Sequence, residues 1–197
     1  MRHLIDSYID AEESETISAF DDMTIVDLIN LKGVDAVEDL PKGIKKKDKA
    51  VAEAIENNVR KLIIEQKPTN PRFYEKMSVL LNELIKERKQ SAISYANYLK
   101  KIVELVRSAK NAGATNYPES IDTNALRSLY DNLENKKDRA IYIHKNILKS
   151  KQDDWKGNKI KEKQVKYSIR KALAKFDISE ESEVERIFKL AVNQDEY

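Results

Sequence analysis

Hydrophobic residues recur every three or four positions over most of the chain, and this spacing predicts amphipathic helices. The pattern is clearest in three long segments within residues 46–111, at 49–66, 71–90 and 92–110. Three helices of this length, joined by short polar links, bury their apolar stripes most simply as an antiparallel bundle. Their predicted inward residues are Val51, Ile55, Val59, Leu62 and Ile63; Phe73, Met77, Leu80, Leu81, Leu84 and Ile85; and Ile93, Leu99, Ile102, Val103 and Val106.

Capping residues and prolines mark where helices begin and end. Asp48 is placed to cap the first long helix, which the prolines of the KPTNP segment should end. Asn70 is then expected to cap the second long helix, with Pro71 at its first position. Upstream, Thr24 is expected to cap a short helix that Gly33 ends.

Shorter helical patterns flank the three long segments. Residues 1–45 form an acidic lead-in of expected short helices, the first at residues 2–11. Residues 112–197 begin with a loop and then predict four helices. Ser179 or Ser182 is the expected cap of the last helix.

Composition also favours helices over sheet. The chain has four glycines and four prolines in 197 residues, fewer than the many tight turns of an all-β domain usually need. Charged residues make up 36% of the chain, and long helices offer the exposed surface that so much charge requires. We therefore predict one all-α domain over residues 1–197, an irregular multi-helix bundle with a central antiparallel set of long helices.

The sequence also bears on the compartment. It contains no cysteine, which excludes disulfides, thiolate metal sites and cysteine nucleophiles. No apolar run reaches the length that crosses a bilayer, and the N-terminal residues lack a secretory signal pattern. We expect a soluble cytoplasmic protein that does not act at a membrane.

Charge alternates along the chain although the formal net charge is only +2. Residues 1–40 hold eleven acidic and two basic residues, a net charge of −9. Residues 145–175 hold eleven basic and three acidic residues, a net charge of +8, and residues 176–197 return to −5 with seven acidic and two basic residues. The acidic segments can pack against the basic one within the fold, or the basic segment can face a partner. Composition leaves both alternatives open.

The basic segment contains a candidate binding stripe. If Asn158 caps a helix, four basic residues fall at i, i+4, i+7 and i+11 on one face: Lys159, Lys163, Lys166 and Arg170. A different face, predicted to pack inward, carries Ile160, Val165, Ile169, Leu173 and Phe176. The stripe is either the solvated side of an amphipathic helix or a contact for DNA phosphates or an acidic protein. No recognition motif accompanies it, so DNA contact through it would be independent of sequence.

Catalytic motifs are missing from the sequence. There is no phosphate-binding loop, and neither histidine has a catalytic motif around it. His144 is therefore predicted to be a structural or surface residue. Acid-x-Lys triplets, as in metal-dependent nucleases, occur at residues 154–156, 87–89 and 134–136. Those nucleases place the two side chains on one strand, whereas residues two apart on a helix do not share a face. We therefore predict no catalytic, metal or cofactor-binding residue in this chain.

Trp155 is the single tryptophan and precedes an expected turn at Gly157 and Asn158. A tryptophan in this position is usually a structural anchor that holds the loop against the core. The alternative is an exposed interface residue that contributes binding energy to a partner.

Four blocks, taken together and in this order, show a family resemblance. They resemble the C-terminal helical region of the R subunit of type I restriction enzymes, and the resemblance extends over nearly the whole chain. Two positions depart from the expected pattern, where Lys156 replaces an arginine and Glu134 a glycine. The blocks are ENNVRKLIIEQKPTNPRFYEKMSVLLNELI, AISYANYLKKIVELVR, YPESIDTNALRSLYDNL and QDDWKGNKIKEKQVKYSIRKAL.

The resemblance implies a modular parent protein. In that family the R subunit carries a nuclease domain and two motor domains that use ATP and magnesium to translocate DNA, and the helical region follows them. This region is associated with docking the R subunit onto the methyltransferase and specificity subunits. Met1 would then begin a fragment that is not itself an enzyme and binds no cofactor. The leading hypothesis is therefore an assembly module, and the alternative is a DNA-contact module that uses the basic stripe.

Overall fold

The computed structural model describes residues 24–39, 48–111 and 117–197, and these form helices joined by loops, with no strand among them. The predicted all-α fold is therefore confirmed for this part of the chain. The helix expected at residues 2–11 lies outside the described residues. None of the described helices is long and apolar enough to span a bilayer. The elements are α1 (Ile25–Lys32), the 3₁₀ helix η1 (Gly33–Asp39), α3 (Asp48–Gln66), α4 (Pro71–Lys89), α5 (Tyr95–Lys110), α6 (Asn124–Asn132), α7 (Lys137–Ser150), α8 (Lys159–Ala174) and α9 (Glu181–Val192).

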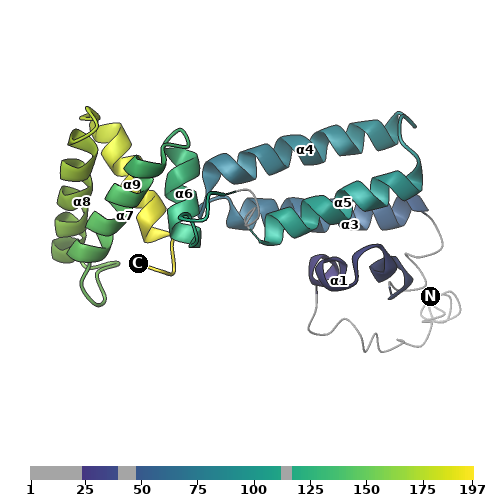
Figure 1. The fold of residues 1–197 in the computed structure, drawn as a ribbon. Helices are drawn as coiled ribbons and strands as arrows, with labels where there is room; N and C mark the ends of the chain where they lie inside the picture. The colour runs from purple at the N-terminus through teal and green to yellow at the C-terminus, as the bar shows by residue number, and fades with distance from the viewer. Residues whose placement is uncertain (1–23, 40–47, 112–116) are drawn as a thin grey trace, which may run out of the picture.

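The three long helices form the predicted antiparallel set. Helices α3, α4 and α5 lie side by side, and α1 and η1 pack against this set (Figure 1). The five elements share one hydrophobic cluster, which we call the first core. Its most fully buried members include Ile55, Val59, Leu81, Ile102 and Val106.

An ion pair between the buried Glu56 and the partly buried Arg88 crosses the first core. Arg88 on α4 donates from Nε and Nη2 to the two carboxylate oxygens of Glu56 on α3, at 2.7 and 3.1 Å. The hydroxyl of Tyr98 on α5 donates to the same carboxylate at 3.1 Å. Burial raises the pKa of Tyr98, so the phenol stays protonated and remains a donor. The bidentate geometry fixes the register of the three helices, because any sliding would leave a buried charge without its partner.

Helices α6, α7, α8 and α9 gather at one end of the long helices (Figure 1) and bury a separate hydrophobic cluster, the second core. Its side chains come from all four helices and from the flanking loops, and Ile143, Ile169 and Ile187 are fully buried. The second core is thus built entirely from residues downstream of the long helices.

Helix ends follow the predicted caps in most cases. Thr24 forms a capping box with Asp27, and Gly33 ends α1 with a φ of +64°, a conformation that favours glycine. Asn70 accepts from the amide of Phe73 at 3.3 Å, with Pro71 in the first turn of α4. Asp48 is the first residue of α3 rather than a flanking cap, and its carboxylate lies near the positive end of that helix.

The predicted cap of α9 is wrong. The capping position is Glu180, whose side chain makes no capping bond, so neither Ser179 nor Ser182 fills the role. The helix begins between these two serines. Glu181 and Glu183 lie in its first turn, where negative charge interacts favourably with the helix dipole.

Two apolar residues that were predicted to be inward are exposed. Ile160 is 73% exposed because residues five apart on a helix differ by about 140° in direction, so Ile160 and the buried Val165 lie on different faces. Leu80 is 47% exposed because the apolar stripe of α4 is wider than the arc that α3 and α5 cover.

The two cores meet at the turn between α3 and α4, and the contact there is polar. The carbonyl of Thr69 accepts from Ser128 and from Gln194, both at 2.7 Å. The side-chain amide of Asn70 donates to Asp131 at 2.7 Å, and its oxygen accepts from the side chain of Asn132 at 2.9 Å. We call this set the seam: Thr69, Asn70, Ser128, Asp131, Asn132 and Gln194.

The seam concentrates the buried polar groups of the structure. Among the described residues, the buried polar or charged side chains are Glu56 and four members of the seam, Asn70, Ser128, Asn132 and Gln194. Buried amides and hydroxyls are stabilising only when their hydrogen bonds are made, and these bonds have narrow geometry. The seam therefore fixes how the second core sits on the long helices.

Replacing Asn70 with alanine should destabilise the protein strongly. The change removes the cap of α4 and leaves the buried amide of Asn132 without one acceptor, so we expect a loss of about 2–4 kcal/mol in the free energy of unfolding. The matched control is Asn82→Ala on the exposed side of α4, which should change stability by less than about 0.5 kcal/mol. Urea denaturation followed by circular dichroism measures both, and equal effects would contradict the role of the seam.

Candidate functional site

The structure divides the predicted basic stripe into two pairs. Lys166 and Arg170 face α9, where Lys166 contacts Glu185 and Arg170 binds Glu181 at 2.6 and 2.8 Å. The bond to Glu185 raises the pKa of Lys166, and the Arg170 guanidinium lowers the pKa of Glu181. Half of the stripe is therefore neutralised by the acidic C-terminal helix.

Lys159 and Lys163 complete the stripe and differ from the other pair. Both are exposed on the first half of α8, and neither has a hydrogen-bond or ion-pair partner within the described ranges. Helix α9 supplies its carboxylates to Lys166 and Arg170, further along α8. The structure thus leaves two of the four candidate cations available to a partner.

A different set of residues lies on the outward side of α8. Ile160 is 73% exposed and Tyr167 is 53% exposed, and Lys163 and Lys171 are exposed beside them at helical spacing. The Lys171 ammonium lies 4.7 Å from the centre of the Tyr167 ring, a cation–π contact that orients both side chains. We call Ile160, Lys163, Tyr167 and Lys171 the outer face of α8.

The outer face carries no competing acid. Glu162 is the one acidic residue of α8, and its carboxylate accepts from the amide of Gly157 at 2.8 Å, in the loop before the helix. The face is consequently basic and partly apolar. The sequence prediction missed Ile160, Tyr167 and Lys171, although their spacing opposite the buried Val165 and Ile169 carried the signal.

Trp155 is a buried residue next to α8. It is 2% exposed, its Nε1 donates to the carbonyl of Tyr197 at 3.0 Å, and its ring packs edge-on against Phe188. Lys156 binds the carbonyl of Gln194. Trp155 therefore holds the last residues of the chain against the loop before α8 and presents no face to a partner.

In the nuclease-like triplet at residues 154–156, the acid and the lysine are held in different surroundings on either side of the buried Trp155. Asp154 is exposed in a turn with a φ of +52°, while the Lys156 ammonium is engaged by a backbone carbonyl. Within the described part of the chain, no group of three His, Asp or Glu residues is placed to hold a metal ion. The geometry at this triplet offers no shared phosphate or metal position.

His144 on α7 belongs to the same region. Its Nδ1 lies 2.6 Å from the hydroxyl of Tyr197, and burial lowers its pKa although Glu196 and Asp122 act in the opposite direction. The neutral imidazole and the phenol share one hydrogen bond whose direction depends on the imidazole tautomer, and burial also raises the pKa of Tyr197. This pair fastens the end of the chain to α7.

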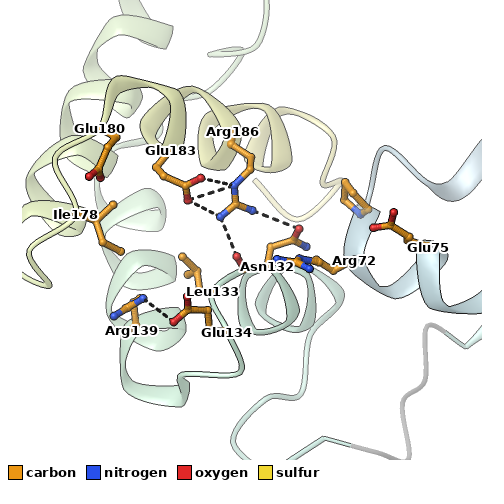
Figure 2. Close-up of a pocket in the computed structure, with 11 residues that line it drawn as sticks. Arg72, Glu75, Asn132, Leu133, Glu134, Arg139, Ile178, Glu180, Glu183 and Arg186 are labelled. Carbon is orange, nitrogen blue, oxygen red and sulfur yellow. Dashed lines mark hydrogen bonds and ion pairs between the residues drawn. The ribbon is translucent and has the colours of Figure 1, made fainter.

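A polar hollow of about 660 Å³ lies next to the seam, between the start of α4, the α6–α7 turn and the start of α9 (Figure 2). Its charged lining residues are Arg72, Arg139 and Arg186 with Glu75, Glu134, Glu180 and Glu183.

Most of the charged side chains in this hollow form ion pairs with one another. Arg186 donates to the carbonyl of Asn132 at 2.8 Å and to the carboxylate of Glu183 at 2.6 Å. The hydrogen bond from Arg186 lowers the pKa of Glu183. Arg139 lies 3.8 Å from Glu134 (Figure 2). Because four carboxylates meet three guanidinium groups, the hollow has no surplus positive charge for an anion. Its observed contacts join α9 to α6 and are structural.

No family model, curated protein or solved structure matches this chain. The outer face of α8 is accordingly the candidate functional site on its own chemistry.

The stability of the protein should fall at mildly acidic pH in a way that depends on His144. The folded-state pKa of His144 is lowered, so the unfolded chain binds the proton more readily. Stability is then retained above a pH of about 6.5 and is lost as the pH falls from that value towards the folded-state pKa.

The measurement compares the free energy of unfolding of the wild type and of His144→Gln across this pH range. We expect the difference between the two proteins to change with pH, because glutamine does not titrate. Parallel pH profiles would contradict a contribution from His144.

Proposed function

We propose that this chain is a helical assembly module of the R subunit of a type I restriction enzyme, acting in the cytoplasm. It would dock the ATP-dependent, DNA-translocating endonuclease subunit onto the methyltransferase and specificity subunits. The nuclease and motor chemistry, with its ATP and magnesium, would belong to other domains of the parent. The resemblance of four sequence blocks and the all-α fold support this proposal.

The observation that carries the proposal is the outer face of α8. Ile160 and Tyr167, seven residues apart, share one face of α8 and are each more than half exposed, and exposed apolar groups gathered on one face mark surfaces that another protein covers. Ile160 and Tyr167 provide the apolar contact. Lys163 and Lys171 select a partner surface with negative charge.

The arrangement of charges on α8 supports the DNA-contact alternative less than it supports a protein interface. Binding to the DNA backbone depends on cations that are free to replace counterions at phosphates. Lys166 and Arg170 are engaged by Glu185 and Glu181, so only Lys159 and Lys163 of the stripe remain available. An exposed isoleucine contributes nothing to phosphate contact, whereas it contributes directly to a protein interface.

Replacing Ile160 and Tyr167 together with glutamate should reduce affinity for the methyltransferase–specificity complex of the same restriction system. Loss of two central apolar contacts and the added negative charge should weaken binding by at least about 30-fold. Both side chains are exposed, so the fold should be kept. The matched control is Ile64→Glu on α3, where an isoleucine of 65% exposure lies away from α8.

Co-elution and calorimetric titration of the purified chain with that complex provide the measurement. Undiminished binding of the Ile160→Glu/Tyr167→Glu variant would reject the outer face as the docking surface. A parallel titration with duplex DNA at several salt concentrations tests the alternative. The DNA-contact function replaces the assembly function if two results are found together. The wild-type chain binds DNA but not the methyltransferase–specificity complex, and Lys159→Glu/Lys163→Glu abolishes the salt-dependent DNA binding.

A further inference from the structure

Helices α4 and α5 enclose a groove that the proposed function does not use. Its volume is about 440 Å³, and no residue of α1, η1 or α3 lines it. The floor is apolar and consists of Met77, Leu80 and Leu84 from α4 and Leu105 from α5. Leu80 is 47% exposed, although its position in the apolar stripe of α4 is one that a helical partner would normally cover. The groove is therefore the uncovered edge of the first core.

The same three-helix set shows how such a groove is filled. Helix α1 packs against α3 and α5 and buries Val26, Leu28 and Ile29 there. Its orientation is fixed at the edge by an ion pair between Asp27 and Lys110 of α5, and this contact lowers the pKa of Asp27. An amphipathic helix with a charged flank thus occupies the α3–α5 side. In the part of the chain that is described, nothing occupies the α4–α5 side.

The rim of the open groove is acidic. Glu83 and Glu87 of α4 and Glu104 of α5 lie along it, and Lys101 is the one cation among the lining residues. Lys101 binds Glu87 at 2.9 Å and closes one end of the groove. Glu83 and Glu104 have no partner among the residues described. The lining therefore carries two uncompensated negative charges, which select a positively charged occupant.

The length of the groove fits a short helix. Its α4 side runs from Met77 to Glu87, which corresponds to about three helical turns or roughly 15 Å. Two antiparallel helices with an apolar floor accept a further helix in the groove between them.

We propose that the α4–α5 groove is a docking site for an amphipathic helix of a second protein. The helix would present leucine or isoleucine at i, i+3 or i+4, and i+7 to the floor and lysine or arginine to Glu83 and Glu104. The surface is separate from the outer face of α8, so the site goes beyond the function proposed above. The acidic residues 1–40 of this chain have the wrong sign of charge for such an occupant.

The probe for this site is a synthetic helix of about four turns with leucines on one face and lysines on both flanks. Its counterpart has the same leucines with glutamates in place of the lysines. Fluorescence anisotropy at moderate salt should show binding of the lysine peptide to the full chain and at least tenfold weaker binding of the glutamate peptide.

Variants of the groove locate the binding. Leu80→Lys should weaken binding of the lysine peptide at least tenfold, and Glu83→Lys/Glu104→Lys should have a similar effect. The matched controls are Ile64→Lys, an exposed isoleucine of α3, and Glu65→Lys, an exposed carboxylate of the same helix. Both controls should bind the peptide as the wild type does, and so should the Ile160→Glu/Tyr167→Glu variant, which separates this site from the outer face of α8.

Equal binding of the two peptides, or an equal loss in Leu80→Lys and Ile64→Lys, would overturn the proposal. Sedimentation of the chain alone supplies a second test. A dimer that Leu80→Lys dissociates would also overturn the proposal, because it would make a second copy the occupant of the groove.

Discussion

The arrangement of this protein depends on the hydrogen bonds of the seam. Hydrophobic burial builds two separate cores, but apolar contacts are not directional and do not fix the angle between two packed units. The side-chain amide of Asn70 and the carbonyl of Thr69 fix this angle. Each of them is hydrogen-bonded to side chains of α6, and the carbonyl of Thr69 also to Gln194. Breaking one of these bonds leaves a buried polar group unpaired, so the bonds are made or lost together.

The last residues of the chain extend this network. The side chain of Gln194 reaches the α3–α4 turn, and that of Glu196 accepts from the first backbone amides of α6 at 2.8 and 3.0 Å. The backbone oxygen of Tyr197 accepts a hydrogen bond from the indole of Trp155, and the hydroxyl of Tyr197 is hydrogen-bonded to His144. Residues 194–197 therefore join α6, α7, the loop before α8 and the long helices. Through these contacts the seam and residues 194–197 connect α8 to the long helices that carry the α4–α5 groove.

Charge is used in three different ways. In the first core, Glu56 and Arg88 form a partly buried pair whose geometry fixes helix register. Between α8 and α9, pairs that are exposed or only partly buried neutralise half of the predicted stripe, and exposed ion pairs contribute little to stability. On the outer face of α8, Lys163 and Lys171 make no ion pair among the described residues, although Lys171 contacts the ring of Tyr167. On the rim of the α4–α5 groove, Glu83 and Glu104 are likewise unpaired within the described ranges. These charges are available to act on another molecule.

The sequence by itself determined the helices, most of their caps and most of the buried residues of the three long helices, because these depend on spacing along one helix and on neighbours within one turn. The division into two cores was not predicted. Thr24, Asn70 and Asn158 are local signals of this kind. Tertiary structure alone decided how much of each apolar or basic stripe is covered. Lys166 and Lys163 look alike in the sequence, yet only Lys166 faces α9, and Leu80 looks like Leu81 until the neighbours of α4 are placed. The physical reason is that a residue's exposure and pairing depend on neighbouring helices, whose positions are set by packing within each core and, between the cores, by the hydrogen bonds of the seam.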